Sequence, residues 1–220
     1  MDASTLTSLL WEGLLQTLYM TLVATLVAYL IGLPIGVSLI VTSPNGISPK
    51  NAYNKVMGFI VNVVRSVPFL ILMIALMPYI RKIIGTGIGT SATTAALIVA
   101  AAPFVARLVE QSLLEVDPGV IEAAQSMGAS NMQIILKVML LEARPSLLNG
   151  AAVATITILG YSAMAGSIGG GGLGDIAIRY GLHRFQPTTM WITVLVLVIL
   201  VQILQELGIR IAAKLDNRIN

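Results

Sequence analysis

The chain has 220 residues, of which 56% are hydrophobic and only 10% are charged. Soluble domains carry roughly a quarter of charged residues, and the mean hydropathy of +0.90 sets this chain far apart from them. The absence of cysteine excludes a disulfide framework and a thiolate metal site, and one histidine cannot build a metal cluster. We therefore expect an all-α, polytopic membrane protein that forms a single transmembrane domain over residues 1–220.

Five stretches almost free of charge are each long enough to cross about 30 Å of hydrocarbon as a helix. Four prolines lie in or near them, so bent helices that pack on neighbouring helices are expected. Within the first stretch, Gly32 and Gly36 have the G-x-x-x-G spacing that lets helices approach closely, although glycine is also common in membrane helices generally. The five stretches are Leu14–Val41, Met57–Ile80, Gly89–Leu108, Leu147–Ser167 and Thr189–Gln205.

An odd number of spans places the two termini on opposite sides of the membrane. The first apolar stretch is too long for a signal peptide and lacks a basic flank, so it is expected to stay as a span. With the N-terminus outside and the C-terminus inside, nine basic residues lie inside and four outside, which satisfies the positive-inside tendency. The inside residues would be Lys50, Lys55, Arg65, Arg107, Lys137, Arg144, Arg210, Lys214 and Arg218.

Arg65 is a charged residue within the second, otherwise uncharged stretch, so its guanidinium needs an environment other than hydrocarbon. Its guanidinium either reaches the cytoplasmic headgroups by snorkelling or pairs inside a dimer. No Asp, Glu, Lys or His lies in the middle of any expected span. That pattern disfavours an ion-coupled carrier or a channel, in which such a side chain would relay the ion.

Residues 117–145 carry helix signals of their own between two spans, on the side expected to be cytoplasmic. Asp117 is a good N-cap and is followed by a proline, and Gly128 can end a helix in a left-handed cap. Ser130 and Gln133 form a capping-box pattern for a second short helix, which should run until the closing proline at position 145. The segment is therefore predicted to be a helical hairpin.

The first helix of this hairpin has two different faces. The apolar face is formed by Val120, Ile121, Ala124 and Met127. The polar face is formed by Glu122, Gln125 and Ser126. Such a helix is suited to contact its own protein on one side and something in the aqueous phase on the other.

A spaced pattern in the hairpin consists of Glu122, Ala123, Ala124, Gly128, Val138 and Leu140. It resembles the EAA loop in the membrane subunits of bacterial ABC importers. The resemblance implies the ABC type I importer permease fold, in which this loop is a coupling helix that docks into a groove on a separate ATPase subunit. Leu141 stands where the family usually has proline, so the second helix can continue further. The alternative is an ordinary cytoplasmic amphipathic hairpin.

Two further segments, Asn62–Phe69 and Gly160–Gly174, resemble the permeases of methionine uptake transporters, and the likeness extends from about Gly13 to Arg218. This resemblance implies a homodimer with two ATP-binding subunits and an extracytoplasmic methionine-binding protein. It also implies that the dimer alternates between inward-open and outward-open states in the bacterial inner membrane. The side chains themselves do not select methionine over another small amino acid, so a permease for polar amino acids stays open.

Motifs for catalysis are absent from the sequence. There is no phosphate-binding loop and no H-E-x-x-H motif, so ATP and Mg²⁺ would be bound by a partner ATPase, with no cofactor or metal in this chain. No feature suggests nucleic acid as a partner. Glycines 169, 171 and 174 match the dinucleotide fingerprint, but they follow a span and not a strand. The segment Gly169–Gly172 is expected to be either a flexible turn or a loop that a docked binding protein approaches.

The fourth span has polar and adaptable residues at helical spacing. Thr157, Tyr161 and Met164 fall at i, i+4 and i+7, with Thr155 and Ser162 on the adjacent face. We expect one side of this helix to line a passage, with Met164 as a flexible apolar gate. The alternative for Met164 is that it fills a gap between helices. A non-transporting membrane scaffold is disfavoured by the same polar face.

Overall fold

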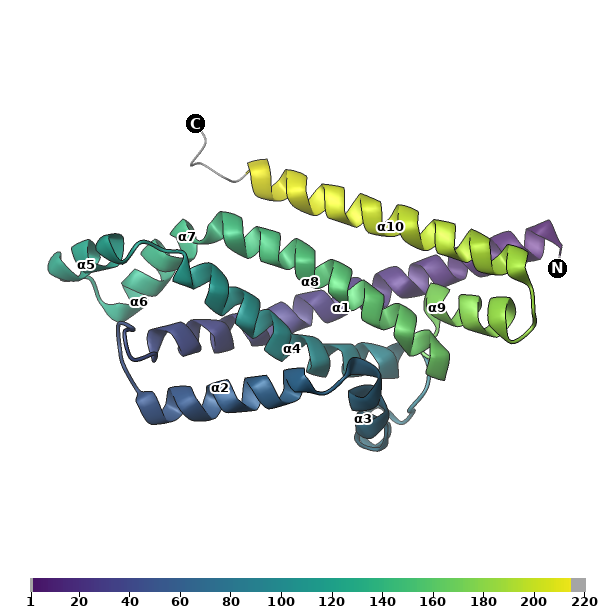
Figure 1. Cartoon of the computed structure of the whole chain (residues 1–220), viewed down its shortest axis with the longest axis horizontal. Helices are drawn as coiled ribbons and strands as arrows, with labels where there is room; N and C mark the ends of the chain where they lie inside the picture. The colour runs from purple at the N-terminus through teal and green to yellow at the C-terminus, as the bar shows by residue number, and fades with distance from the viewer. Residues whose placement is uncertain (1, 215–220) are drawn as a thin grey trace.

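The computed structural model describes residues 2–214, and all regular structure within that part of the chain is helical (Figure 1). Short 3-10 and π segments interrupt the α-helices at Gly166–Ile168, Ile135–Met139 and Ala177–Leu182. Of the basic residues expected inside, Arg218 lies outside the described residues. The α-helices are α1 (Ala3–Val41), α2 (Asn51–Ser66), α3 (Phe69–Ile84), α4 (Thr90–Leu114), α5 (Pro118–Ser126), α6 (Asn131–Ile134), α7 (Leu140–Glu142), α8 (Arg144–Ala165), α9 (Gly172–Ile176) and α10 (Pro187–Lys214).

Four helical runs in residues 2–214 are long and apolar enough to cross a membrane. They are α1, α4, the run that begins with α8, and α10, and the bent pair of α2 and α3 makes a fifth if it is counted as one span. The hairpin that contains α5 and α6 projects at one end of the bundle, and the start of α1 and α9 lie at the opposite end (Figure 1). The predicted all-helical, polytopic architecture is confirmed.

The second predicted span, Met57–Ile80, corresponds to a bent pair of helices and not to one continuous helix. α2 and α3 meet at an angle of 104° across Val67 and Pro68. Proline pushes the preceding residue away from the helical region, and Val67 is extended at φ −81° and ψ 125°. The other prolines in the spans, at positions 34, 78 and 103, remain inside helices.

The centre of the fold is the contact between α1 and α4, which glycine makes possible. A Cβ atom at Gly32 would lie 2.8 Å from the carbonyl oxygen of Ala102, and one at Gly36 would lie 2.5 Å from that of Ala106. Neither contact leaves room for a larger side chain, so the two backbones approach as the G-x-x-x-G spacing predicts. Five alanines of α4 are buried in this region: Ala92, Ala96, Ala101, Ala102 and Ala106.

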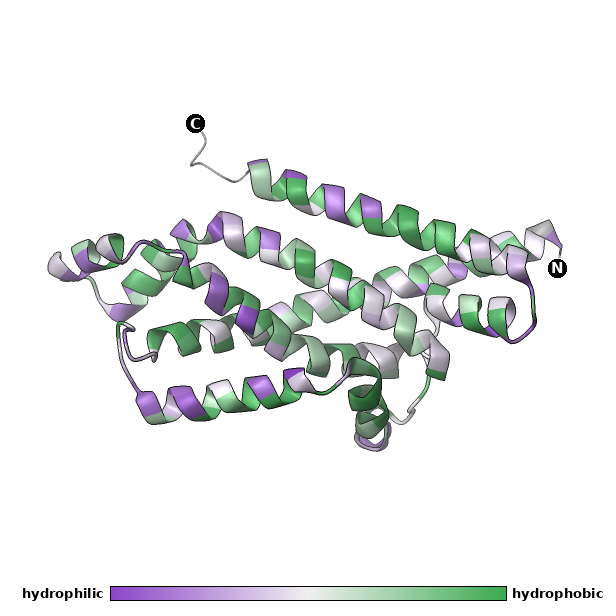
Figure 2. Cartoon of the chain, viewed as in Figure 1, coloured by the Kyte–Doolittle hydropathy of each residue, from purple (hydrophilic) through white to green (hydrophobic). Residues whose placement is uncertain are grey.

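The long apolar faces of α1 and α10 are not covered by any other part of the described chain. Figure 2 shows the middle of α10 coloured as hydrophobic, whereas α2 has hydrophilic residues at both of its ends. Because exposed apolar rows of this length are suited to hydrocarbon and not to water, we assign them to the lipid. On α1 the row is Trp11, Leu15, Tyr19, Leu22, Leu26 and Leu30, and on α10 it is Trp191, Leu195, Val198 and Ile199.

Candidate functional site

The first half of the hairpin has the local structure that the sequence predicts. The Asp117 side chain accepts a hydrogen bond of 2.7 Å from the backbone N–H of Gly119 and caps α5. After α5, Gly128 has φ +79°, and the Ala129 N–H donates to the carbonyl oxygen of Ala124 at 3.1 Å. The glycine is required here because residues with a Cβ atom rarely adopt a positive φ.

The second half begins at the predicted capping box. The Ser130 N–H donates to Gln133 Oε1 at 2.8 Å, and the Gln133 N–H donates to Ser130 Oγ at 3.4 Å. The helix then passes through the π segment Ile135–Met139 and ends with α7 at Glu142, slightly before the predicted end at Pro145. Pro145 lies in the first turn of α8, where its missing N–H costs no intrahelical hydrogen bond.

The apolar face predicted for α5 divides between the interior and the solvent. Ala124 is buried and Ile121 half-buried, whereas Val120 is exposed and Met127 is 81% exposed. Glu122 and Ala123 are exposed as well. Large apolar side chains on the aqueous side of a membrane protein mark a protein interaction surface. The exposed ones on the hairpin are Val120, Met127, Met132, Leu136 and Leu141.

One side of α8 is open along its whole length. Asn149, Val153, Thr157, Gly160 and Met164 recur at helical spacing, and each is exposed or half-exposed. Val153 is 50% exposed and Met164 is 54% exposed, so neither is a core residue of this subunit. The open strip is therefore available to a passage or to another subunit.

Tyr161 connects the open strip to the bent pair of helices. Its ring stacks on that of Phe69 at the start of α3, with centroids 4.6 Å apart and planes 6° from parallel. Stacked rings add to the packing energy beyond the area they bury. The stack joins the bend at Pro68 to the part of α8 that also carries Met164.

Ser162 does not belong to the open strip, which corrects the sequence prediction. It is only 1% exposed, and its hydroxyl donates to the carbonyl oxygen of Leu159 at 2.7 Å. Within the subunit, α8 packs against α10, α4, α1 and α9. We therefore remove Ser162 from the residues that can line a passage and retain Thr157, Tyr161 and Met164.

The glycine-rich turn is held by hydrogen bonds to two helices, which favours an ordered loop over a flexible turn. The Gly172 N–H donates to Gln16 Oε1 at 2.7 Å, and the next N–H donates to Thr17 Oγ1 at 2.9 Å. The Gly89 N–H donates to the carbonyl oxygen of Gly169 at 3.0 Å. The turn is thereby fixed to the first half of α1 and to the start of α4.

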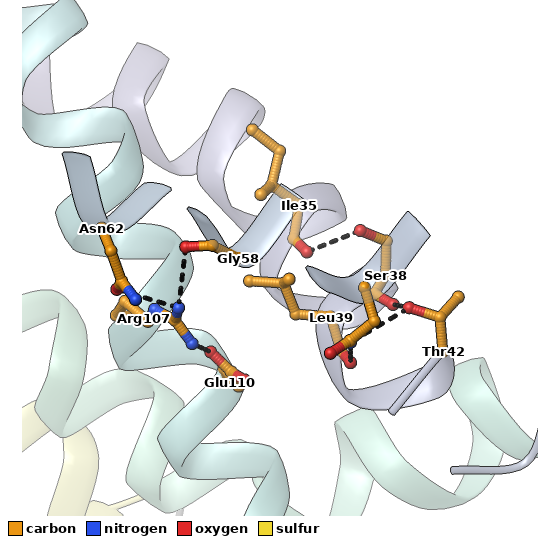
Figure 3. Close-up of polar contacts among 9 residues, drawn as sticks. Ile35, Ser38, Leu39, Thr42, Gly58, Asn62, Arg107 and Glu110 are labelled. Carbon is orange, nitrogen blue, oxygen red and sulfur yellow. Dashed lines mark hydrogen bonds and ion pairs between the residues drawn. The ribbon is translucent and has the colours of Figure 1, made fainter. Parts of the chain in front are cut away.

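A polar network between α2 and α4 was missed by the sequence analysis. Arg107 on α4 pairs with Glu110 at 2.5 Å and donates to Asn62 Oδ1 at 2.9 Å and to the carbonyl oxygen of Gly58 at 3.2 Å (Figure 3). The residues of α2 are more than forty positions from Arg107, so no local pattern could find the connection between the two helices. The available signal was the presence of Asn62 and Arg65 in an otherwise apolar span.

Polar side chains also attach α2 to the end of α1. The Asn54 Nδ2 donates to the carbonyl oxygen of Leu39 at 2.6 Å and to Thr42 Oγ1 at 3.2 Å, and Tyr53 Oη lies 3.2 Å from Ser38 Oγ. Figure 3 shows the residues of α1 that take part. Since Val61 is the one fully buried residue among those of α2, hydrogen bonds supply much of its attachment.

Residues 32–220 match the family described as the binding-protein-dependent transport system inner membrane component. The chain belongs to this family. Its members are membrane components of transport systems, in agreement with the helical, polytopic fold.

Similar proteins of this family are known in bacteria. The probable D-methionine transport system permease protein MetI of Vibrio cholerae is 50% identical over 182 residues, which cover 83% of this chain and 81% of the relative. The methionine import system permease protein MetP of Bacillus subtilis is 46% identical over 209 residues, or 95% of this chain and 94% of the relative.

Solved structures show the same fold. A chain of the MetNI methionine ABC transporter, crystallised in an inward-facing conformation, superposes with a TM-score of 0.96 at 44% identity, covering 99% of this chain and 100% of that one. An amino acid ABC transporter crystallised with histidines has a TM-score of 0.73 at 22% identity, and this likeness concerns the fold alone.

Proposed function

We propose that this chain is the permease subunit of an ATP-driven importer that moves methionine across the bacterial inner membrane. The observation that carries the proposal is the similarity to a chain of the MetNI methionine ABC transporter, with a TM-score of 0.96 and 44% identity over 99% of this chain. Relatives described as methionine permeases at 46–50% identity support the same substrate.

In this proposal the chain is a non-catalytic subunit, and two separate ATP-binding subunits hydrolyse ATP. The hairpin is the contact with these subunits, through Glu122, Ala123 and Ala124 and the turn at Gly128. Two features support this role: α5 projects from the end of the bundle, and exposed apolar side chains such as Met127 surround the pattern. Movement of the ATPases would be transmitted through the hairpin to α8, which begins two residues after α7 ends.

A second copy of the chain completes the passage. The open faces of α2, α4 and α8 carry Arg65, Arg107, Gln111 and Asn149. A charged side chain facing lipid costs about 3 kcal/mol near the bilayer centre, so these faces are suited to a partner and an aqueous passage. A homodimer related by a two-fold axis covers both copies of the face with the same contacts.

Alternating access would then open the passage to one side at a time. Met164 from each copy forms the gate, with Thr157 and Tyr161 below it on the open strip of α8. An extracytoplasmic methionine-binding protein delivers the substrate to the end of the bundle where the glycine-rich turn Gly169–Gly172 lies. The N-terminus lies outside and the C-terminus inside, as the charge distribution predicts.

Co-purification tests the composition of the assembly. The tagged chain, expressed together with the other genes of its transport system, is extracted in mild detergent and weighed as an intact complex by mass spectrometry. We expect two copies of this chain with two ATPase subunits. A chain that purifies without any ATPase and still supports uptake driven by an ion gradient would instead be a secondary carrier.

A further inference from the structure

The polar network between α2 and α4 has a fourth polar side chain, that of Arg65, which the hydrogen bonds alone do not reveal. On α2, Gly58, Asn62 and Arg65 stand at i, i+4 and i+7, so they share one face of the helix. Gly58 and Asn62 both accept hydrogen bonds from Arg107 of α4 (Figure 3). The face that carries Arg65 is therefore the face that α2 turns toward the polar residues of α4.

This cluster is accessible and carries an unbalanced charge. The side chains of Arg107 and Glu110 remain 21% and 19% exposed, and Arg65 is exposed. Glu110 is paired with Arg107 through its Oε2 atom. Within residues 2–214, Arg65 makes neither an ion pair nor a hydrogen bond. Two guanidinium groups and one carboxylate leave one positive charge, which favours an anionic group from outside the chain.

The surroundings argue against lipid as the neighbour of this cluster. The rows on α1 and α10 that we assign to lipid are apolar, whereas the cluster unites two arginines, a glutamate and an amide. α4 contacts both α2 and α8, so the cluster and the open strip of α8 lie on helices that share α4 as a neighbour (Figure 1). The cluster lies on the wall of the passage in the proposed dimer.

We infer that Arg65, Asn62, Arg107 and Glu110 form a binding site in the passage wall for the charged groups of a zwitterionic amino acid. The inference deepens the proposed function and rests on it. The guanidinium of Arg65 binds the substrate carboxylate, since its planar pair of donors matches two carboxylate oxygens. Glu110 accepts the ammonium group through its second oxygen. Arg107 is a positioning residue that fixes Glu110 and is itself held by Asn62.

Such a site binds the α-carboxylate and the α-ammonium group, which all α-amino acids share. It therefore holds the substrate during passage without recognising its side chain, and selection of methionine takes place elsewhere in the system. This division predicts that the site discriminates between methionine and analogues that lack the carboxylate or the ammonium group, and that it discriminates poorly among amino acids.

The test is equilibrium dialysis of radiolabelled methionine against the purified complex of permease and ATPase subunits, without the binding protein. Unlabelled competitors are methionine, methioninol, which lacks the carboxylate, and 4-(methylthio)butanoate, which lacks the ammonium group. We compare the unmodified complex with Arg65→Gln, Arg65→Lys and the control Lys55→Gln, which removes another exposed cation of α2. ATPase subunits are identical in all samples, so any binding to them cancels in the comparison.

We expect Arg65→Gln to weaken binding at least roughly tenfold, as loss of a charge-assisted hydrogen-bonded pair does. Arg65→Lys should weaken it less, Lys55→Gln should leave it unchanged, and both analogues should compete poorly with the unmodified complex. Equal binding by Arg65→Gln, or full competition by methioninol, overturns the inference. The analogue experiment needs no substitution, so it tests the inferred site even where a variant fails to assemble.

An Arg65 that only pairs across the dimer gives a different result. Arg65→Gln then lowers the melting temperature of the complex, while binding per assembled complex stays unchanged, and the inference is wrong. ATP-dependent methionine uptake by the unmodified complex is measured in parallel. Its presence together with unaltered binding by Arg65→Gln refutes this site alone, whereas its absence refutes the proposed function.

Discussion

Replacement of Gly128 by valine isolates the contribution of one backbone conformation to coupling. The residue has φ +79°, and a Cβ atom built there meets nothing within 4 Å. The penalty is therefore one of local backbone strain and not of collision with neighbours. An L-residue in the left-handed region costs about 1–2 kcal/mol, and a β-branched one resists it further. One or two kcal/mol lowers the population of the native turn roughly 5–30-fold.

The assay is methionine uptake per ATP hydrolysed in proteoliposomes that contain the complete transport complex. We expect Gly128→Val to reduce this ratio strongly while the protein still inserts, because the turn lies outside the bundle. Gly128→Asn is the matched control, since asparagine adopts the left-handed region more readily than other residues with a Cβ atom. Unchanged coupling in the valine variant, or equal losses for valine and asparagine, would refute the reasoning.

Three further substitution experiments test the hairpin, the topology and the gate. Glu122→Lys reverses an exposed charge on α5 and should lower uptake at normal membrane insertion; unaltered uptake removes Glu122 from the coupling contact. Ser4→Cys and Ser167→Cys should react with an impermeant thiol reagent from outside, whereas labelling of Met127→Cys in sealed cells would contradict the topology; the chain has no native cysteine. Met164→Ala should change the free energy of unfolding by no more than about 0.5 kcal/mol, as for an exposed residue, yet raise passive solute flux. Met164→Trp should slow uptake, and unchanged flux and uptake in both variants would leave Met164 without a gating role.

The hairpin could be predicted from the sequence because its structure depends on residues close together in the chain. The caps at Asp117 and Ser130 each form within three residues, and the positive φ of Gly128 belongs to a single residue. Such local signals do not depend on how the bundle packs. The structure confirms all three, while their role in coupling stays a prediction.

Bent helices were expected at the prolines, but the complete break at Pro68 could not be predicted, because proline alone does not decide between a kink and a break. Pro34, Pro78 and Pro103 remain inside helices, whereas Pro68 separates α2 from α3. The difference lies in the tertiary neighbours, among them the stack of Phe69 on a tyrosine 92 positions further along the chain. Only the folded structure brings these two rings together.

The faces of α8 show a second limit of sequence analysis. Helical spacing gives the relative directions of Thr157, Tyr161 and Ser162, but not which direction faces the subunit interior. Ser162 is buried and Thr157 is half-exposed, although both were expected to line the passage. Likewise, the pairing of Arg107 with Asn62 depends on the register between two helices, which the spacing within either helix does not contain.

The central claim is that this chain forms the membrane passage of an ATP-driven methionine importer. The most direct measurement is uptake of labelled methionine into proteoliposomes that contain the chain, its ATPase subunits and its binding protein, with and without ATP. We predict accumulation that requires ATP and the binding protein, and that excess unlabelled methionine abolishes. Methionine accumulation that is driven by an imposed ion gradient without ATP would contradict the account. So would a complex that hydrolyses ATP but does not take up methionine.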